Sequence, residues 1–362
     1  MSVNFLLHLT MKKILLFLII LLSLNIFRAS AQGDGVAQLL KTAPGDATKL
    51  IDAFANPLFK GFGNGINNGW TNTAKTKGLL GFELRVSGSA IFTPSADKTF
   101  DITQIGLSSN IRPKAGTGTV APTFGGANIS NPPTLQILSS QGLVLDEFQL
   151  PTRQMPVNLA PQIQLTAGLI KHTDVTLRAI PKFKINNDIG KVSMFGVGFK
   201  HNIMEDFFGG VGGKLIPFDL AIAAGYTRLN YEKALDVRPS TGRVPEAASA
   251  GKTDFSNQRI EGHFSGFNLQ AIISKKFLVF TPFAAVGFNT AKTDVGLLGN
   301  YPVTSGLATY TVYTDPVTIN KNSVSNFKLD AGFQLDLAFF KFYASGSLGQ
   351  YKSVTAGIGI GI

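Results

Sequence analysis

The sequence contains no cysteine and few charged residues. Without cysteine, a disulfide framework, a thiol nucleophile and a cysteine-ligated zinc site are all excluded. Charged residues make up 15% of the chain and hydrophobic residues 44%, whereas an average soluble domain is roughly 25% charged. After residue 31, however, no segment approaches the ~18 consecutive apolar residues of a membrane helix. This combination is typical of a barrel that crosses an outer membrane with strands.

The last 38 residues show the strand pattern most clearly. From Phe327 to Ile362, apolar and polar residues alternate through three long segments, and a strand places such residues on opposite faces. Three two-faced strands joined by tight connections indicate a closed antiparallel sheet. The alternation alone leaves open whether the apolar face meets lipid or the core of a soluble sandwich.

The same alternation begins near Leu79 and recurs along the chain, which gives 12 strands, or 14 if a hairpin near Thr309 to Thr314 is added. Long connections at 108–133, 233–255 and 290–324 interleave with short ones at 171–174, 274–276 and 338–340. Outer-membrane barrels have long loops outside and short turns in the periplasm. We therefore predict an all-β, transmembrane antiparallel β-barrel of 12–14 strands over residues 78–362, closed by pairing of the last strand with the first.

The N-terminal region predicts export. Met11, Lys12 and Lys13 precede an apolar run from Ile14 to Leu24, and Ala29-Ser30-Ala31 follows. A basic start, a short apolar core and an A-x-A step make a secretory signal peptide. We predict a cleaved signal peptide over residues 1–31, with Met11 as an alternative start, and location in the outer membrane of a Gram-negative cell.

Residues 32–77 lack strand alternation. Asp46 is placed to cap a short helix with Leu50 and Phe54 on one face, which Pro57 would end. Glycines then separate several aromatic residues. Two interpretations stay open, an ordered N-terminal extension and a partly helical plug inside the barrel lumen. The expected plug or ligand contacts are Phe54, Leu58, Phe59, Phe62 and Trp70.

Candidate chemical groups are few. The three histidines after residue 31 lie in no metal-binding or hydrolase motif, so we expect no enzyme activity, no metal and no cofactor. One strand carries a charged face, either a solvated lumen wall or a selectivity site for anionic solutes. Its members are Asp174, Arg178, Lys182 and Lys184.

The chain has a formal net charge of +11. Removing the predicted signal peptide leaves 30 basic and 22 acidic residues. The basic residues form no run of four or more after that point, which argues against nucleic acid as a partner. The phosphates of outer-membrane lipid and lipopolysaccharide are the expected partners.

The layout resembles that of the FadL/TodX-type channels for hydrophobic compounds. The similarity rests on a signal peptide, a short plug-like segment with an Asn56-Pro57 step, and a phenylalanine-rich barrel. The stretch NPLFKGFGNGINNGW at 56–70 and KTFDI at 98–102 also resemble an uncharacterised family of Gram-negative outer-membrane proteins. The resemblance implies passive uptake of a hydrophobic, fatty-acid-like ligand past the plug, and insertion by the barrel-assembly machinery.

Three hypotheses follow. The first is an outer-membrane channel for passive uptake of hydrophobic or amphipathic small molecules. The second is a structural or adhesive barrel with a closed lumen and partner-binding loops. The third is a secreted soluble β-sandwich.

Overall fold

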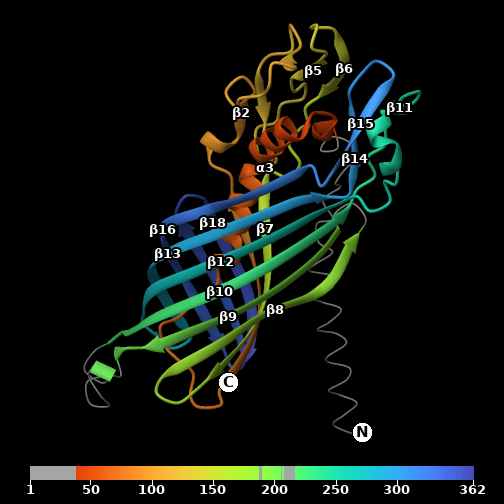
Figure 1. The fold of residues 1–362 in the computed structure, drawn as a ribbon. Coiled ribbons are helices and arrows are strands. Elements are labelled where there is room, and N and C mark those ends of the chain that lie inside the picture. Colours follow the sequence, from red (N-terminus) through yellow and green to blue (C-terminus); the bar gives the residue numbers. More distant parts are fainter. Residues whose placement is uncertain (1–37, 187–189, 205, 208–216) are drawn as a thin grey trace, which may run out of the picture. The chain divides into compact units, whose positions relative to one another are not determined.

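The computed structural model describes residues 38–186, 190–204, 206–207 and 217–362. The predicted signal peptide, the alternative start at Met11 and the first residues of the predicted plug therefore lie outside the described residues. Within the described part, ten antiparallel strands form a closed barrel in the order β1-β18-β17-β16-β13-β12-β10-β9-β8-β7 (Figure 1). This confirms the predicted fold class.

Each barrel strand pairs with the next barrel strand in the sequence, and the missing strand numbers belong to strands within the connecting loops. The barrel strands are β1 (Phe82–Phe92), β7 (Val157–Gly168), β8 (Thr173–Asn186), β9 (Gly190–Asn202), β10 (Asp219–Ala234), β12 (Arg259–Ser274), β13 (Phe280–Leu298), β16 (Val317–Leu337), β17 (Phe340–Leu348) and β18 (Lys352–Gly361). The last strand pairs with the first, with Leu84 opposite Ile360, as the sequence predicted.

Alternation decides which side chains face outward. In β1, Glu83 and Arg85 are buried, whereas Phe82 and Leu84 are about half exposed. The other strands repeat this pattern, so the outer wall is apolar and the inner wall polar. An apolar outer band around a polar lumen is the pattern of a membrane-spanning barrel. Among the described residues, no helix is long and apolar enough to cross a membrane.

The barrel has fewer strands than the predicted 12–14. The expected hairpin near Thr309 to Thr314 and other segments of the long connections form small sheets outside the barrel: β2 (Thr99–Asp101) with β4 (Val120–Pro122), β3 (Ile111–Pro113) with β5 (Thr134–Leu138) and β6 (Val144–Gln149), and β11 (Val244–Pro245) with β15 (Thr309–Thr314) and β14 (Asn300–Thr304). These strands have two to six residues each, too short to cross a bilayer at about nine residues or more.

These sheets belong to three long connections that we call the loop head, residues 93–156, 235–258 and 299–316, which also contain η2 (Ser95–Asp97) and η3 (Ala247–Lys252). The three connections bind one another. Arg243 donates a hydrogen bond of 3.1 Å to the Leu145 carbonyl oxygen, Thr304 donates to Asp146, and Val244 pairs with Thr309. The loop head lies at one end of the barrel, and the C-terminal end lies at the other, which we call the short-turn end (Figure 1).

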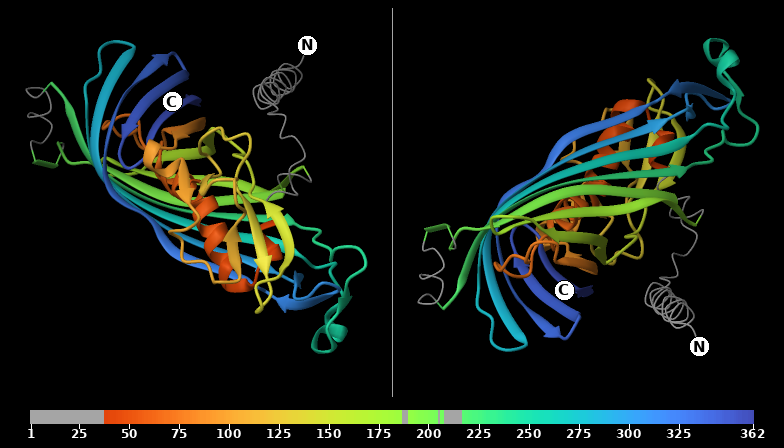
Figure 2. Two further views of the ribbon diagram at one scale, coloured as in Figure 1. Left: turned by 90° about the horizontal axis from the view of Figure 1, so that it is seen from above. Right: turned by 90° about the horizontal axis from the view of Figure 1, so that it is seen from below.

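A helix enters the barrel from the loop head. After η1 (Leu39–Lys41), α3 (Pro44–Asn67) contacts β1, β7, β10, β12, β13 and β16. The extended residues 68–81 continue to the short-turn end, where Figure 2 shows them among the strand ends. The expected end of the helix at Pro57 was wrong, since Pro57 lies inside α3.

Three glycines allow α3 to continue beyond Pro57, because they leave room for the barrel wall. A Cβ at Gly61 or Gly65 would lie 2.3 Å from the Asn158 side chain or 2.6 Å from the Ala160 side chain of β7. A Cβ at Gly63 would lie 2.8 Å from Ala291 of β13, which is on the opposite side of the ten-strand order. The glycines that follow the expected helix end thus let a helix fit between opposing walls, where tertiary packing outweighs their low helix propensity.

Candidate functional site

The C-terminal end of α3 lies inside the lumen and exposes backbone carbonyl groups. Such groups lack intrahelical donors and carry the negative end of the helix dipole. Arg178 of β8 donates 2.6 Å and 2.9 Å hydrogen bonds to the carbonyl oxygens of Ile66 and Asn68, and Gln162 donates to Gly65. Barrel side chains therefore fix the end of the helix.

Arg178 is completely buried. Its other polar contacts are the Gln164 amide oxygen at 3.1 Å and the Thr227 hydroxyl at 3.4 Å. A buried charge is costly unless hydrogen bonds surround it, and here four acceptors do so. The residue joins α3, the segment after it and two barrel strands at one point.

Trp70 follows the helix and is held between two surfaces. The Arg178 guanidinium carbon lies 4.0 Å from the indole centroid, a cation–π arrangement. The indole also lies against Gly198 of β9 and Gly225 of β10, where an added Cβ would approach its ring to 2.6 Å and 2.3 Å. The backbone oxygen of Trp70 accepts a 3.0 Å hydrogen bond from Arg85. The only tryptophan of the chain thus anchors the extended residues 68–81, which we call the lumen segment.

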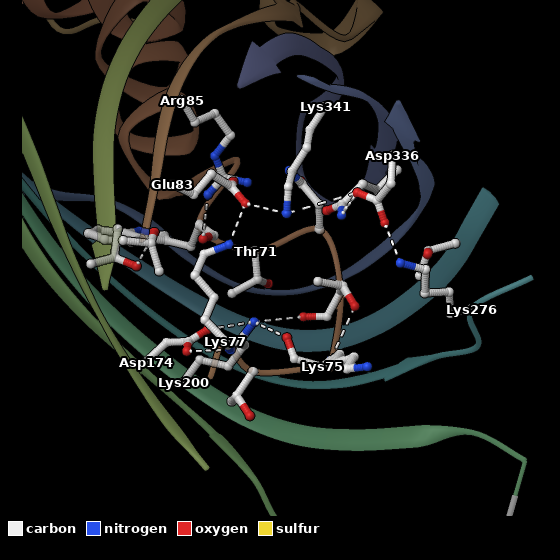
Figure 3. A pocket seen from close by; sticks show the side chains of 18 of the residues that line it. Thr71, Lys75, Lys77, Glu83, Arg85, Asp174, Lys200, Lys276, Asp336 and Lys341 are labelled. Atoms are coloured by element: carbon white, nitrogen blue, oxygen red, sulfur yellow. Dashed lines mark hydrogen bonds and ion pairs between the residues drawn. The ribbon is translucent and has the colours of Figure 1, made fainter. Parts of the chain in front are cut away.

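Below this anchor, a cavity of about 200 Å³ lies at the short-turn end, among residues 70–78 and the barrel wall. We call it the vestibule. Six of its lining residues are basic and three are acidic, from seven separate segments (Figure 3). The basic residues are Lys75, Lys77, Arg85, Lys200, Lys276 and Lys341, and the acidic residues are Glu83, Asp174 and Asp336.

Ion pairs link the vestibule side chains in two groups. Glu83 accepts from Lys77 Nζ at 2.6 Å and lies 3.4 Å from Lys341 Nζ, and it accepts a 2.7 Å hydrogen bond from Tyr343. Lys341 also lies 3.9 Å from Asp336, which pairs with Lys276 at 3.1 Å.

Across the vestibule, Asp174 pairs with Lys200 at 3.0 Å and accepts a hydrogen bond from the Lys77 backbone. Lys200 also donates to the carbonyl oxygens of Thr73 and Lys75. The same charged groups therefore hold the lumen segment and line the cavity.

The predicted plug residues lie around α3 and the loop head. Phe54 and Phe59 are buried, and Phe62 is partly buried. Phe54 packs edge-to-face on Phe124 of the loop head, while Phe59 and Phe62 pack on Phe264 of β12. Leu58 is half-buried. The three phenylalanines pack on other protein side chains, and Trp70 lies apart from them at the vestibule.

The predicted charged face of β8 is divided. Asp174 and Arg178 point into the lumen and are buried. Lys182 and Lys184 are exposed, and Lys182 pairs with Glu232 at 2.8 Å. Register irregularities after Ile180 and Lys184 interrupt the regular pairing of β8 with β9. The prediction of a single four-residue lumen cluster was therefore wrong for its last two members.

Sequence patterns do not single out the other vestibule residues, although Glu83, Arg85 and Asp336 stand at polar positions of the strand alternation. These side chains meet because they lie at the same height along the barrel, which depends on the register of the strands. Glu83 and Lys341 lie at the starts of β1 and β17, Lys200 and Asp336 lie at the ends of β9 and β16, and Lys276 lies in the β12–β13 connection.

The histidines are separated. His172 lies in the β7–β8 connection, His201 on β9 and His263 on β12. His201 lies 2.6 Å from Asp206, and His263 lies 2.8 Å from the Asn230 amide oxygen. Among the described residues, no group of three metal-ligating side chains comes together.

The fold, with its apolar outer wall and occupied polar lumen, is that of an outer-membrane β-barrel. Residues 11–362 match a family described as "Family of unknown function (DUF6588)", and the chain belongs to this family. No curated protein matches the sequence.

Solved structures similar to this chain include other outer-membrane proteins. The attachment invasion locus protein Ail of Yersinia pestis has 6% identity, covers 79% of this chain and 100% of its own, and gives a TM-score of 0.25. The protease OmpT of Escherichia coli has 6% identity over 82% and 100%, with a TM-score of 0.33. The toluene transporter TodX of P. putida has 11% identity over 77% and 67%, with a TM-score of 0.23.

Proposed function

We propose that this protein is an outer-membrane barrel whose lumen is kept closed by α3 and whose loop head binds a protein partner outside the cell. The packing of α3 carries this proposal. Gly61 and Gly65 lie against one wall and Gly63 lies against the opposite wall. Arg178 then fixes the end of the helix. A helix in this position occupies the path that a solute would take.

The construction of the loop head supports a binding role. Its apolar interior includes Leu135 and Phe148 and belongs to the same buried cluster as Leu50 and Phe54 of α3. The helix thus serves as a base for the loops. Connections held in this way present a surface of fixed shape, which lowers the entropic cost of binding.

Apolar side chains are exposed on this ordered surface. Leu143 is 62% exposed and Leu307 is 74% exposed. Val144, next to Leu143 in the sequence, is also exposed, as is Val244, whose backbone N–H donates to the carbonyl oxygen of Ala308 beside Leu307. The hydrogen bond from Arg243 to Leu145 joins the two loops that carry the valines. Exposed apolar side chains on an ordered loop surface are typical of protein-binding sites.

Two measurements test the proposal. Purified protein in planar bilayers is expected to show no steady conductance, and cells that carry the protein are expected to adhere to a partner-coated or cellular surface. A variant with L143S, V144S and L307S should adhere less while its barrel still migrates as a compact species in unheated detergent gels. Steady conductance by the wild type, or undiminished adhesion by the triple variant, would contradict the proposal.

Passive uptake of hydrophobic compounds is the second candidate. The aromatic layer of Phe54, Phe59, Phe62 and Phe264 near the loop head supports it. Uptake would require α3 to move, and a solute would then meet the charged vestibule. A fluorescent fatty acid should enter cells that carry the wild type faster than cells that lack the protein if this candidate is correct. Equal rates would leave the closed barrel as the better explanation.

A further inference from the structure

We propose that the vestibule binds a small doubly charged oxyanion, such as inorganic phosphate or a dicarboxylate. This inference is independent of the proposed loop-head function, because the vestibule lies at the other end of the barrel. It rests on the charge, the hydrogen-bond donors and the position of the side chains that surround one cavity.

The charge of the lining is unbalanced. Six basic residues face three acidic ones. A terminal carboxylate at Ile362, which also lines the cavity, would still leave an excess of two positive charges. In a cavity with protein walls, such an excess produces a strong positive potential that concentrates anions. A divalent anion would balance it.

The basic groups differ in how fully they are already paired. Asp174 pairs with Lys200, and Glu83 pairs most closely with Lys77. Lys341 lies at 3.4 Å and 3.9 Å from two acids that each have a shorter partner. Lys75 is exposed, and among the described residues it forms no ion pair within 4.0 Å. Lys75 and Lys341 are therefore the cations most available to a ligand.

Neutral donors complete the site. Six threonines line the same cavity, three from the lumen segment and three from β7, β8 and β13. A hydroxyl group can donate one hydrogen bond, and bonds from such donors and from ammonium groups to an oxyanion are shorter and stronger than neutral ones. Of the lining residues, only Trp70 and Ile362 have large apolar side chains, which argues against a fatty acid at this place.

The protein contains its own reporter of occupancy, since Trp70 lines the vestibule and is the only tryptophan. Detergent-solubilised full-length protein would be titrated with sodium phosphate, and separately with succinate, at constant ionic strength maintained with sodium chloride. We expect a saturable change in Trp70 fluorescence with at least one of the two anions. The same anion should raise the thermal midpoint, because a ligand that binds the folded state stabilises it.

The variants K75M and K341M test the assignment with little risk to the fold. Without Lys341, Glu83 keeps Lys77 and Asp336 keeps Lys276. The matched control is K171M, which alters an exposed lysine in the β7–β8 connection at the same end of the barrel, outside the cavity lining. We expect the double variant K75M/K341M to bind the anion about tenfold more weakly or worse, given the usual strength of charged hydrogen bonds. K171M should bind the anion like the wild type.

The titration has results that support the oxyanion site and results that overturn it. Phosphate binding without succinate binding, or the reverse, identifies the preferred oxyanion and supports the site. A response that sodium chloride reproduces, no saturation with either anion, or equal weakening by K171M would overturn it. Adhesion and conductance do not enter this test, so its failure leaves the loop-head proposal untouched.

Discussion

The guanidinium of Arg178 covers one face of the Trp70 indole at 4.0 Å, while its nitrogens bind the carbonyl oxygens of Ile66 and Asn68. One barrel residue therefore holds both the end of α3 and the aromatic anchor that follows. Because all of these groups are buried, water cannot replace the bonds that Arg178 makes. Arg178 therefore positions the lumen segment both at the end of the helix and at the indole.

Replacing Arg178 by methionine should loosen the lumen segment. The buried Asn68 carbonyl oxygen would lose its donor, at about 1–3 kcal/mol, and the Ile66 carbonyl oxygen would keep only the Thr227 hydroxyl. We expect a red-shifted Trp70 emission and brief conductance events in planar bilayers. R178K should have an intermediate effect because it keeps the charge but not the two-pronged geometry.

The control for this prediction is R228M. Arg228 is an exposed arginine on β10, so its loss should change neither the Trp70 emission nor the conductance. If R178M behaves as R228M does, Arg178 does not hold the lumen segment.

A second prediction concerns the glycines of α3. G63A would place a methyl group 2.8 Å from Ala291 and Val324, and such overpacking costs about 1–3 kcal/mol. G45A adds the same methyl group in the first turn of α3, where nothing lies within 4 Å. We expect a lower thermal midpoint for G63A and an unchanged or higher one for G45A, since alanine favours helix. Equal midpoints would mean that α3 is not confined by the walls.

Strand alternation allowed the barrel, its closure and its inward-facing residues to be predicted, because the side-chain period of a strand is visible in the sequence. Glu83, Arg85 and Asp336, for example, stand at polar positions of this alternation and face inward. The level at which side chains from different strands meet depends on register, which alternation does not give. The vestibule, built by Lys200, Lys276 and Lys341 among others, could therefore not be predicted.

The length of α3 was underestimated for a different reason. Pro57 and the glycines at 61, 63 and 65 are unfavourable in an isolated helix. Contacts with the barrel wall reverse that preference, and the wall residues Asn158, Ala160 and Ala291 are distant in sequence. The charged face of β8 was misjudged similarly, since irregular pairing after Ile180 cannot be read from alternation.

A third prediction concerns pH. Tyr351, in the β17–β18 connection, donates a 2.7 Å hydrogen bond to Asp97 of η2, which also binds Lys60 of α3. Burial, together with the bond to Asp97, raises the pKa of the Tyr351 phenol above its usual 10. Below pH 10 the phenol is neutral in both the folded and unfolded chain, so its contribution to stability is complete. As pH rises above 10 the unfolded chain loses the proton first and is favoured, so stability falls.

Thermal midpoints between pH 8 and pH 11 test this prediction. Wild type should lose stability over this range more steeply than Y351F, which has no phenol to ionise. At pH 8, Y351F should be less stable by about 1 kcal/mol for the lost hydrogen bond. If the thermal midpoints of the two proteins fall in parallel with pH, Tyr351 does not link the β17–β18 connection to the loop head.

The fourth prediction concerns the direction in which the N-terminal segment enters the barrel. Lys41 lies 4.0 Å from Asp146 of the loop head, and Ser108 donates hydrogen bonds to Asp46. The 24 residues of α3 span roughly 36 Å at 1.5 Å per residue. The chain therefore passes from the loop head toward the short-turn end, and the long loops of outer-membrane barrels lie outside the cell.

Single cysteines report this direction cleanly, since the chain has none of its own. Ala43, just before α3, and Lys75 at the vestibule are both exposed. A membrane-impermeant maleimide should label A43C on intact cells, and K75C only after the outer membrane is permeabilised. A115C in the loop head and K171C in the β7–β8 connection calibrate the two sides. A different result would be labelling of A115C on intact cells, with A43C and K171C labelled only after the outer membrane is permeabilised. The helix α3 would then enter from the periplasmic side, and the closed-lumen proposal would lose its structural basis.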